Sequence, residues 1–388
     1  MVVNVTYKYG NEDEDYIVIS ESGMFDAEWY LSNYNINTEM DPLKHFLLEG
    51  SQKFYNPSPD FDTLWYLDEY GSEIEEDMNP LVHYIKYGVK NRYIPKLYDF
   101  EEIDGLNLNK TIKGKNDYLF LINDRNNELR HHFDKNYVNQ FKYVDFIRDY
   151  YFKKFLFDKM NIKYYYFIVP DKSVVCKDLI PFKYEVIKRN TDKIGFIPDF
   201  IENLTISDYW RYDTHINYKG AKKLVFNYLK HIDDSFTQEQ YENSINECRI
   251  KEITEKQDLL HELNWSYTEE EKEGIKLFET EVPIPKRIDT LNIPEEFSKC
   301  GKRDSEYFYN PDSLTNMRAL IFRDSSTKIL KLYLNLYFKE VFLYWDHLEL
   351  NKDLIEWYKP NIIIEIRTER FIENYRTSRW IEKLISKM

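Results

Sequence analysis

The chain has 388 residues, of which 43% are hydrophobic and 31% charged, so it can bury the core of one large domain or of two smaller ones. Its formal net charge of −15 argues against a nucleic-acid-binding protein, which would need a concentrated basic surface. The three cysteines, Cys176, Cys248 and Cys300, are widely spaced and form no Cys/His pattern, so no metal site is predicted.

The N-terminal 24 residues are expected to form one or two short strands. Residues 2–9 alternate between apolar and polar side chains, and residues 16–19 form a short apolar run. Residues 1–10 lack the basic start and apolar stretch of a signal peptide, and no segment approaches the roughly 20 apolar residues of a membrane span. These features predict a cytoplasmic protein without a transmembrane segment.

An internal repeat follows. The sequence FDAEWYLSNY…DPLKHFLLEG at 25–50 returns as FDTLWYLDEY…NPLVHYIKYG at 61–88. Each copy predicts two short helices, because an Asp or Asn precedes each helix start, a proline occupies the first position of the second helix, and a glycine ends it. His45 and His83 lie on the apolar helical pattern, which favours a core or interface position over a binding site. The copies resemble a small helical module found beside enzymes of bacterial surface-polysaccharide synthesis, and residues 20–98 are therefore expected to dock to such proteins.

From residue 97 onward, strands alternate with helices. Strands are expected at 118–122, 164–169, 318–322, 340–345 and 362–366, and helices at 136–160, 218–232, 326–338 and the C-terminus. This order predicts a three-layer α/β domain with a mainly parallel sheet over residues 99–388, preceded by the helical repeat module of residues 1–98. Residues 240–300 are highly charged and are expected to form an insertion of helices and loops.

Two short segments carry groups suited to acyl transfer. Asp213 and His215 are separated by one residue, and Ser325 lies where a predicted strand passes into a helix. A serine hydroxyl needs a neighbouring base, a histidine is that base near neutral pH, and a carboxylate holds the histidine in the required tautomer. Each motif alone has a structural alternative, since an Asp-Ser pair can simply cap a helix and an Asp-x-His can be a solvated loop. Their joint occurrence predicts a Ser325–His215–Asp213 triad.

The stretch from about Gly114 to the C-terminus resembles the alginate O-acetyltransferase family (the AlgJ/AlgX type), which has an SGNH-hydrolase-like fold. The motifs that carry the resemblance are GKNDYLFL at 114–121, VPDK at 169–172, DTHIN at 213–217, RDSS at 323–326, and PNII at 360–363 with Glu369-Arg370. As in that family, the Asp-His pair precedes the serine. The resemblance implies that Ser325 takes an acetyl group, His215 acts as base and Asp213 orients it.

Three positions depart from the family motifs. Arg323 stands where the family has glycine, so it can alter the oxyanion hole or supply a charge near it. Ser326 replaces phenylalanine and offers a second hydroxyl, although the resemblance favours Ser325. Ile216 replaces tryptophan and removes an aromatic wall for substrate stacking.

The remaining candidates for substrate or oxyanion binding are Asn217, Lys172 and Trp345. Lys172 has the alternative of a solvated lysine at a strand end. His347, which follows a predicted strand, is the alternative candidate for the base. Arg370 is expected to pair with Glu365.

These features favour an O-acetyltransferase that modifies hydroxyls of a bacterial surface polysaccharide or its precursor. No resident cofactor is predicted, and the acetyl donor is either acetyl-CoA or an acyl group passed on by a membrane acyltransferase. The expected partners are a polysaccharide or oligosaccharide acceptor and polysaccharide-synthesis proteins. Two alternatives remain: a carbohydrate acetylesterase with the same triad, and a non-catalytic glycan-binding or assembly subunit.

Overall fold

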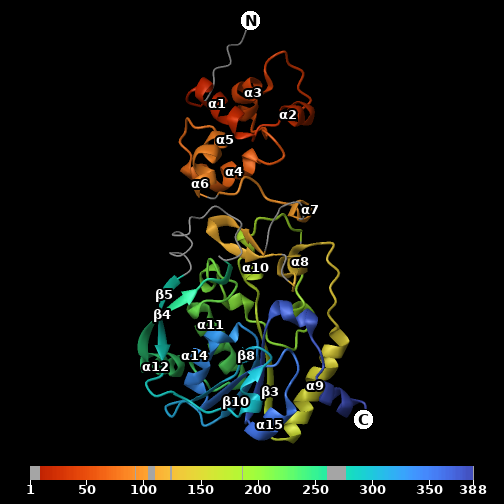
Figure 1. Ribbon diagram of the computed structural model, residues 1–388, viewed down its shortest axis with the longest axis vertical. Coiled ribbons are helices and arrows are strands. Elements are labelled where there is room, and N and C mark those ends of the chain that lie inside the picture. Colours follow the sequence, from red (N-terminus) through yellow and green to blue (C-terminus); the bar gives the residue numbers. More distant parts are fainter. Residues whose placement is uncertain are drawn as a thin grey trace. The chain divides into compact units, whose positions relative to one another are not determined.

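The structure is a computed structural model that describes residues 9–91, 93–103, 110–122, 125–185, 187–259 and 277–387. Two compact units make up the chain (Figure 1). The first comprises Met1–Asn107, Lys113–Tyr118 and Leu179–Tyr184, and the second comprises Leu108–Ile112, Leu119–Asp178 and Glu185–Met388. Each unit has a hydrophobic core of its own. Within the described residues, every helix is too short or too polar to cross a bilayer.

The first unit is helical. Its helices are α1 (Glu12–Ser22), α2 (Ala27–Asn33), α3 (Pro42–His45), α4 (Thr63–Tyr70), α5 (Pro80–His83), α6 (Val89–Asn91) and α7 (Phe100–Ile103). The strand expected at 16–19 is wrong, because these residues lie inside α1. Asn11 caps that helix by accepting hydrogen bonds from the backbone N–H groups of Asp13 and Glu14, and the acidic first turn suits the positive end of the helix dipole. Most of the other expected strand, residues 2–8, lies outside the described residues.

The predicted repeat of two short helices is confirmed. Helices α2 and α3 form the first copy, and α4 and α5 form the second. Asp26 and Asp62 cap α2 and α4 through equivalent backbone hydrogen bonds. In both copies the second helix continues into a wider turn that ends at Gly50 or Gly88.

The repeat histidines lie in the core of the first unit, as the apolar pattern predicts. The ring Nδ1 of His45 lies 3.0 Å from the hydroxyl oxygen of Tyr30, and that of His83 lies 2.9 Å from the hydroxyl oxygen of Tyr66. All four side chains are buried. Because a buried hydroxyl and a buried imidazole each need a hydrogen-bond partner, each pair satisfies two polar groups at once.

Gly50 is required by the same arrangement. A Cβ atom there would lie 2.1 Å from the hydroxyl oxygen of Tyr30, which is itself held by His45. We expect Gly50→Ala to lower the free energy of unfolding by roughly 1–3 kcal/mol, because overpacking forces a buried ring to move. Thermal unfolding of the full chain measures this. Gly71→Ala is the matched control, since nothing lies within 4 Å of its Cβ position and its φ is −58°. Equal melting temperatures for both variants would contradict the expectation.

The second unit is built on a six-stranded sheet with the order β3-β12-β10-β11-β9-β6. Its strands are β3 (Lys163–Val169), β6 (Asp289–Thr290), β9 (Glu306–Tyr309), β10 (Arg318–Arg323), β11 (Glu340–Trp345) and β12 (Ile362–Thr368). Strands β3, β12, β10 and β11 are parallel; at one edge β9 pairs antiparallel with β11, and β6 pairs antiparallel with β9. The mainly parallel α/β sheet is therefore confirmed.

Helices cover both faces of this sheet, which gives three layers (Figure 1). On one face lie α9 (Tyr143–Lys159), α15 (Lys352–Tyr358) and α16 (Arg379–Ile385); on the other lie α11 (Tyr218–Ile232) and α14 (Thr327–Tyr337). On the second face, the ring of Phe167 stacks on that of Tyr228 from α11, with centroids 4.3 Å apart. The shorter elements of the unit are β1 (Thr111–Lys113), β2 (Leu119–Leu121), α8 (Glu128–Phe133), α10 (Lys172–Val175) and α12 (Gln238–Asn246).

The charged segment 240–300 is only partly as expected. After α12 it forms an antiparallel pair, β4 (Arg249–Lys256) with β5 (Leu277–Ile284), rather than helices and loops alone. The short strands β6, β7 (Lys299–Cys300) and β8 (Arg303–Asp304) also fall in or beside it. Residues 260–276 lie outside the described residues. Five of the eight residues of β4 are charged, and they hide the alternation that identifies a strand.

Candidate active site

Ser325 lies at the edge of the sheet where the parallel strands end. Strand β10 ends at Arg323, and α14 begins at Thr327, so Ser325 occupies the turn between strand and helix. The side chain of Asp324 fixes this turn. Its Oδ1 accepts hydrogen bonds from the backbone N–H (2.9 Å) and the hydroxyl (2.6 Å) of Ser326, and its Oδ2 accepts from the backbone N–H of Thr368 (2.6 Å) at the end of β12. The buried carboxylate thus joins the ends of two neighbouring strands around Ser325.

Asp324→Ala is expected to lower the free energy of unfolding by roughly 2–4 kcal/mol, since it leaves three buried donors without their acceptor. Turnover should fall as well, because the Ser325 turn loses its anchor. Chemical denaturation and kcat measure the two effects. Asp304→Ala removes an exposed aspartate of the same unit and should leave both nearly unchanged. A stability of Asp324→Ala equal to that of this control would refute the anchoring role.

Asp213 and His215 lie in the loop that leads into α11. Asn217 caps that helix: its side-chain oxygen accepts from the backbone N–H of Gly220 (3.1 Å), and its side-chain nitrogen donates to the carbonyl of Ser207 (2.8 Å). Gly220 allows the close approach, because a Cβ there would lie 2.5 Å from the carbonyl oxygen of Asp208. The structure therefore places the Asn217 amide in the helix cap, where both of its polar atoms already have partners.

The structure brings Ser325, His215 and Asp213 together in one hydrogen-bonded chain. His215 Nε2 lies 2.9 Å from Ser325 Oγ, and His215 Nδ1 lies 2.7 Å from Asp213 Oδ1. The backbone N–H of His215 also donates to Asp213 Oδ1 (2.8 Å), which fixes the carboxylate relative to the ring. These distances are those required of a nucleophile, its base and the group that orients the base.

The electrostatics of the pair suit a general base. Burial alone would lower the pKa of His215, but the hydrogen bond and charge of Asp213, together with the charge of Asp258, outweigh it and raise that pKa above its usual value. Burial would raise the pKa of Asp213, but the interactions with His215 lower it overall. Asp213 is therefore ionised near neutral pH and stabilises the imidazolium that forms when Ser325 gives up its proton.

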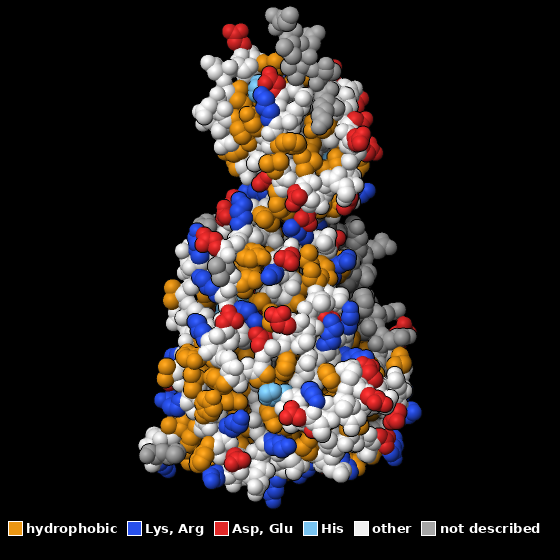
Figure 2. Space-filling view, turned by 180° about the vertical axis from the view of Figure 1, so that it is seen from behind, with side chains coloured by type: hydrophobic (Ala, Val, Ile, Leu, Met, Phe, Trp, Pro, Cys, Tyr) orange, Lys and Arg blue, Asp and Glu red, His pale blue; other side chains and the backbone are white. Residues whose placement is uncertain are grey.

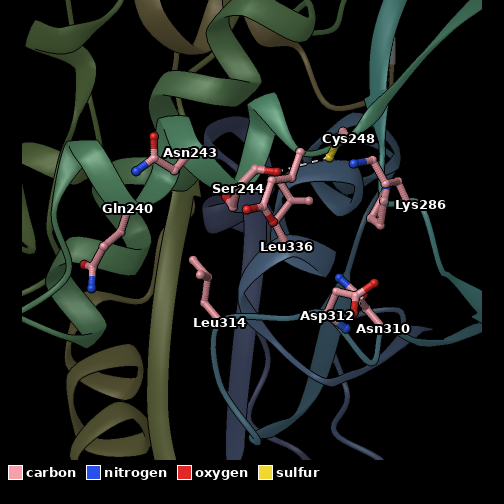
Figure 3. A pocket seen from close by; sticks show the side chains of 11 residues that line it. Gln240, Asn243, Ser244, Cys248, Lys286, Asn310, Asp312, Leu314 and Leu336 are labelled. Carbon is pink, nitrogen blue, oxygen red and sulfur yellow. Dashed lines mark hydrogen bonds between the residues drawn. The ribbon is translucent and has the colours of Figure 1, made fainter.

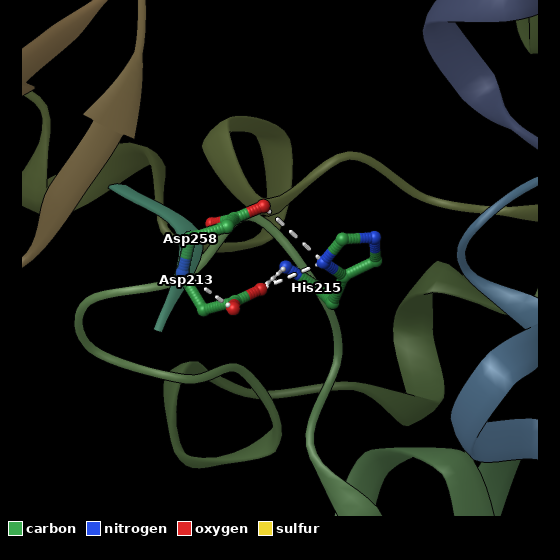
Figure 4. A group of neighbouring side chains, drawn as sticks. All are labelled: Asp213, His215 and Asp258. Atoms are coloured by element: carbon green, nitrogen blue, oxygen red, sulfur yellow. Dashed lines mark hydrogen bonds and ion pairs between the residues drawn. The ribbon is translucent and has the colours of Figure 1, made fainter. Parts of the chain in front are cut away.

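Asp258 is a group at this site that sequence reasoning missed. It follows β4 in the charged segment, and its backbone N–H donates to Asp213 Oδ2 (2.9 Å). Figure 4 shows its carboxylate beside the His215 ring, with Oδ2 3.5 Å from Nδ1. Nothing in the sequence distinguishes Asp258 from the many other acidic residues of that segment.

The side chains of Asp213, His215 and Asp258 lie close enough to hold a cation, since one ligand atom from each falls within 4.8 Å of the others. Their contacts nevertheless fit a hydrogen-bond network better. Asp213 Oδ1 already accepts from two N–H groups of His215, and a metal ion there would have to displace one of them.

Lys172 is buried below this loop and is not solvated. Its Nζ donates to the carbonyl oxygens of Leu119 (2.7 Å), Arg211 (2.9 Å) and Asp213 (3.0 Å). Burial lowers the pKa of its amine to about 8. Lys172 therefore holds the triad loop against β2.

Arg323, Trp345 and His347 face another part of the unit. The Arg323 guanidinium donates to Glu306 (3.1 Å) and lies 5.4 Å from the ring centre of Trp345. His347 is exposed, has a left-handed backbone (φ 48°), and lies beside Gly301 in the β7–β8 turn. The structure therefore places all three against β7–β9, whereas His215 and Ser325 meet at the start of α14.

Two further expectations concern Ser326 and Arg370. The hydroxyl of Ser326 is buried and donates to Asp324, so it serves the turn rather than standing free as a second nucleophile. Arg370 pairs with Glu128 and Asp171 instead of Glu365. Glu365 is itself bound to Lys153 and Arg367.

A cavity of about 160 Å³ opens at the triad, lined by Trp210, Asp213, His215, Asp258, Ser325, Lys328 and Ile329. A larger cavity of about 420 Å³ lies between α12, Lys286 and the loop that carries Asn310 and Asp312 (Figure 3). Its lining includes Cys248, whose Sγ donates to the carbonyl of Ser244, and burial raises the pKa of that thiol to about 11. A thiol with this pKa is a poor nucleophile, so the triad cavity is the better candidate for group transfer.

The face of the molecule seen in Figure 2 carries acidic and basic side chains interspersed with apolar ones. Over the second unit on that face, blue and red side chains alternate over short distances.

No protein-family model matches the chain, and no curated protein matches it by sequence. Solved structures resemble it at low identity. PatB1 from Bacillus cereus, with a sulfonyl adduct, is 12% identical over 68% of this chain and 97% of that one, with a TM-score of 0.44. A DHHW family protein from Eubacterium siraeum is 15% identical over 69% and 99%, with a TM-score of 0.42. The O-acetyltransferase domain of AlgJ from Pseudomonas putida is 12% identical over 72% and 100%, with a TM-score of 0.41. Likenesses at these values assign neither a family nor an activity.

Proposed function

We propose that this protein is a serine-dependent O-acetyltransferase that acetylates hydroxyls of a bacterial surface polysaccharide or its precursor. The observation that carries the proposal is the chain of contacts from Asp213 through His215 to Ser325, with 2.7 and 2.9 Å separations. The motifs shared with the alginate O-acetyltransferase family support the choice of acetyl as the group transferred.

In the first half of the reaction, Ser325 Oγ attacks the acetyl carbonyl of the donor while its proton passes to His215 Nε2. The bond from the carbonyl carbon to the donor breaks, and His215 returns the proton to the leaving group. In the second half, a sugar hydroxyl gives its proton to His215 Nε2 and attacks the carbonyl carbon of the acyl-enzyme. The bond from that carbon to Ser325 Oγ breaks, and His215 returns the proton to Ser325 Oγ. Ser325 lies just before the N-terminus of α14, where the helix dipole favours the negative charge that develops on the carbonyl oxygen.

The cavity size agrees with a short acyl group. Pockets for whole small-molecule ligands usually measure about 300–1,000 Å³. The triad cavity, at about 160 Å³, is well below that range. It suits an acetyl group and leaves the sugar to bind outside it; Lys328 and Trp210 are among the residues that line it.

A carbohydrate acetylesterase is the second candidate, and one observation favours it. The His215 side chain is 24% exposed, so water can reach the base and take the place of a sugar hydroxyl. The two activities differ only in whether an acceptor excludes water from the acyl-enzyme.

The deciding experiment incubates the protein with p-nitrophenyl acetate and a panel of oligosaccharides, and separates acetylated sugar from free acetate by mass spectrometry. A transferase should release p-nitrophenol faster when an acceptor is present and should yield acetylated sugar. If free acetate is released at the same rate with and without each sugar, the protein is an esterase. A folded protein that does neither would support the glycan-binding alternative. Repeating the assay with acetyl-CoA tests that donor directly.

A further inference from the structure

Asp258 contacts the triad loop at three points. Its backbone N–H donates to Asp213 Oδ2 (2.9 Å), which is the carboxylate oxygen that His215 does not use. Its own carboxylate accepts from the backbone N–H (2.8 Å) and the hydroxyl (2.7 Å) of Thr214. The residues on both sides of the Asp213–Thr214 bond are thus held by one aspartate from the charged segment.

The same carboxylate also faces the catalytic ring. Asp258 Oδ2 lies 3.5 Å from His215 Nδ1 (Figure 4), whereas Ser325 contacts the other ring nitrogen, Nε2. The Thr214 hydroxyl lies 3.2 Å from the same nitrogen and donates to Asp258, so it bridges the two groups. His215 Nδ1 therefore faces two carboxylates, from two segments far apart in the sequence.

The other charges near His215 do not duplicate this effect. Arg370, after β12, acts on His215 in the opposite direction, because its positive charge lowers the pKa of the ring. Lys328, on α14, lines the cavity and also carries a positive charge. Asp213 and Asp258 are thus the two groups whose negative charge favours the imidazolium.

We propose that Asp258 is a positioning residue of the acyl-transfer site, which fixes the Asp213 carboxylate and adds a second negative charge behind His215. The inference rests on the proposed function. The segment that carries Asp258 is accordingly part of the active site, although it stands apart from the strands and helices that carry the triad.

The size of the effect follows from exposure. The Asp258 side chain is 41% exposed, so water screens its charge. We expect Asp258→Asn to lower kcat/KM by roughly 5- to 20-fold. This loss is larger than that from removing an exposed charge and smaller than that from removing a hydrogen bond to a charged group. His215 must be neutral to accept the Ser325 proton, so activity rises with pH through its pKa. Without the Asp258 charge that rise should move to lower pH, by roughly half a unit.

The test compares wild type, Asp258→Asn and Glu252→Gln in the pH profile of kcat/KM with p-nitrophenyl acetate. Asp258→Asn keeps the backbone N–H that serves Asp213 and removes the charge. Glu252, an exposed acid on β4, is the matched control for loss of a charge from the same segment. We expect the shifted profile and the reduced kcat/KM in Asp258→Asn alone, with Asp258→Glu recovering part of both. The proposal is overturned if the pH profiles of wild type and Asp258→Asn coincide, or if Asp258→Asn loses stability without any shift of its pH profile.

An NMR titration of the His215 ring, assigned with His215→Gln, separates this inference from the proposed function. If the wild type proves inert as an enzyme, the ring pKa should still fall in Asp258→Asn when Asp258 faces His215 as described. An unchanged ring pKa would overturn the inference whatever the activity.

Discussion

Ser325→Ala is expected to reduce turnover of p-nitrophenyl acetate by about 10³-fold or more, with the fold unchanged. The Ser325 hydroxyl donates a hydrogen bond of 2.9 Å to His215 Nε2, and an alanine leaves the base with nothing to activate. The acetyl-enzyme should also disappear. Mass spectrometry of the protein after a brief exposure to p-nitrophenyl acetate should show one added acetyl group in the wild type and none in the variant.

Ser326→Ala is the matched control, because it removes the neighbouring hydroxyl from the same turn. That hydroxyl is bound to Asp324, so its loss should cost stability and only a few-fold in rate. The result that would contradict the assignment is a reversal, with Ser326→Ala inactive and Ser325→Ala still acetylated.

Asp213→Asn is expected to lower kcat by roughly 10³- to 10⁴-fold. The carboxylate accepts two N–H bonds from His215, whereas an amide can turn its own N–H₂ group toward Nδ1 and stabilise the wrong tautomer. The remaining activity should appear at lower pH than in the wild type. The charge of Asp213 raises the pKa of His215, and the base becomes neutral at lower pH once that charge is gone.

The comparison with Asp258→Asn gives this prediction its control. Both variants replace an aspartate near the same ring nitrogen, but only Asp213 hydrogen-bonds the ring directly, at 2.7 Å rather than 3.5 Å. Asp213→Asn should therefore be the more damaging by at least about tenfold. A smaller loss than in Asp258→Asn would mean that the two carboxylates have exchanged roles.

Strands and helices with a strong apolar pattern were predictable from the sequence. Strand β11 and helix α11 have the expected limits, because β11 is apolar or aromatic at every position after Glu340 and α11 begins directly after its cap at Asn217. Helix α9 begins seven residues later than expected, at Tyr143 rather than 136. The preceding loop is held by side chains, since Glu373 accepts hydrogen bonds from Tyr137 and Gln140. Such a tertiary contact leaves no periodic signal.

The site was predictable only where a family motif marked it. Asp213 and His215 are neighbours in sequence, but Ser325 is 110 residues from His215, and their contact depends on how the sheet is assembled. Lys172 lies in a motif, yet its burial and its three carbonyl partners depend on contacts with two other segments. Asp258 has no motif and reaches the site from a segment whose strands the sequence did not reveal.

Because a tyrosine and a glycine approach each other closely in each helical repeat, we expect these two positions to vary together among related sequences. Tyr30 and Gly50 are 20 residues apart, and Tyr66 and Gly88 are 22 apart. A larger side chain at Gly50 requires a smaller ring at Tyr30, and one at Gly88 requires room from Tyr84 as well as Tyr66, so neither glycine can change first without a loss of stability. Related chains should therefore keep or lose both residues together. The spacing of such pairs offers a way to count copies of this module in sequences too divergent to align.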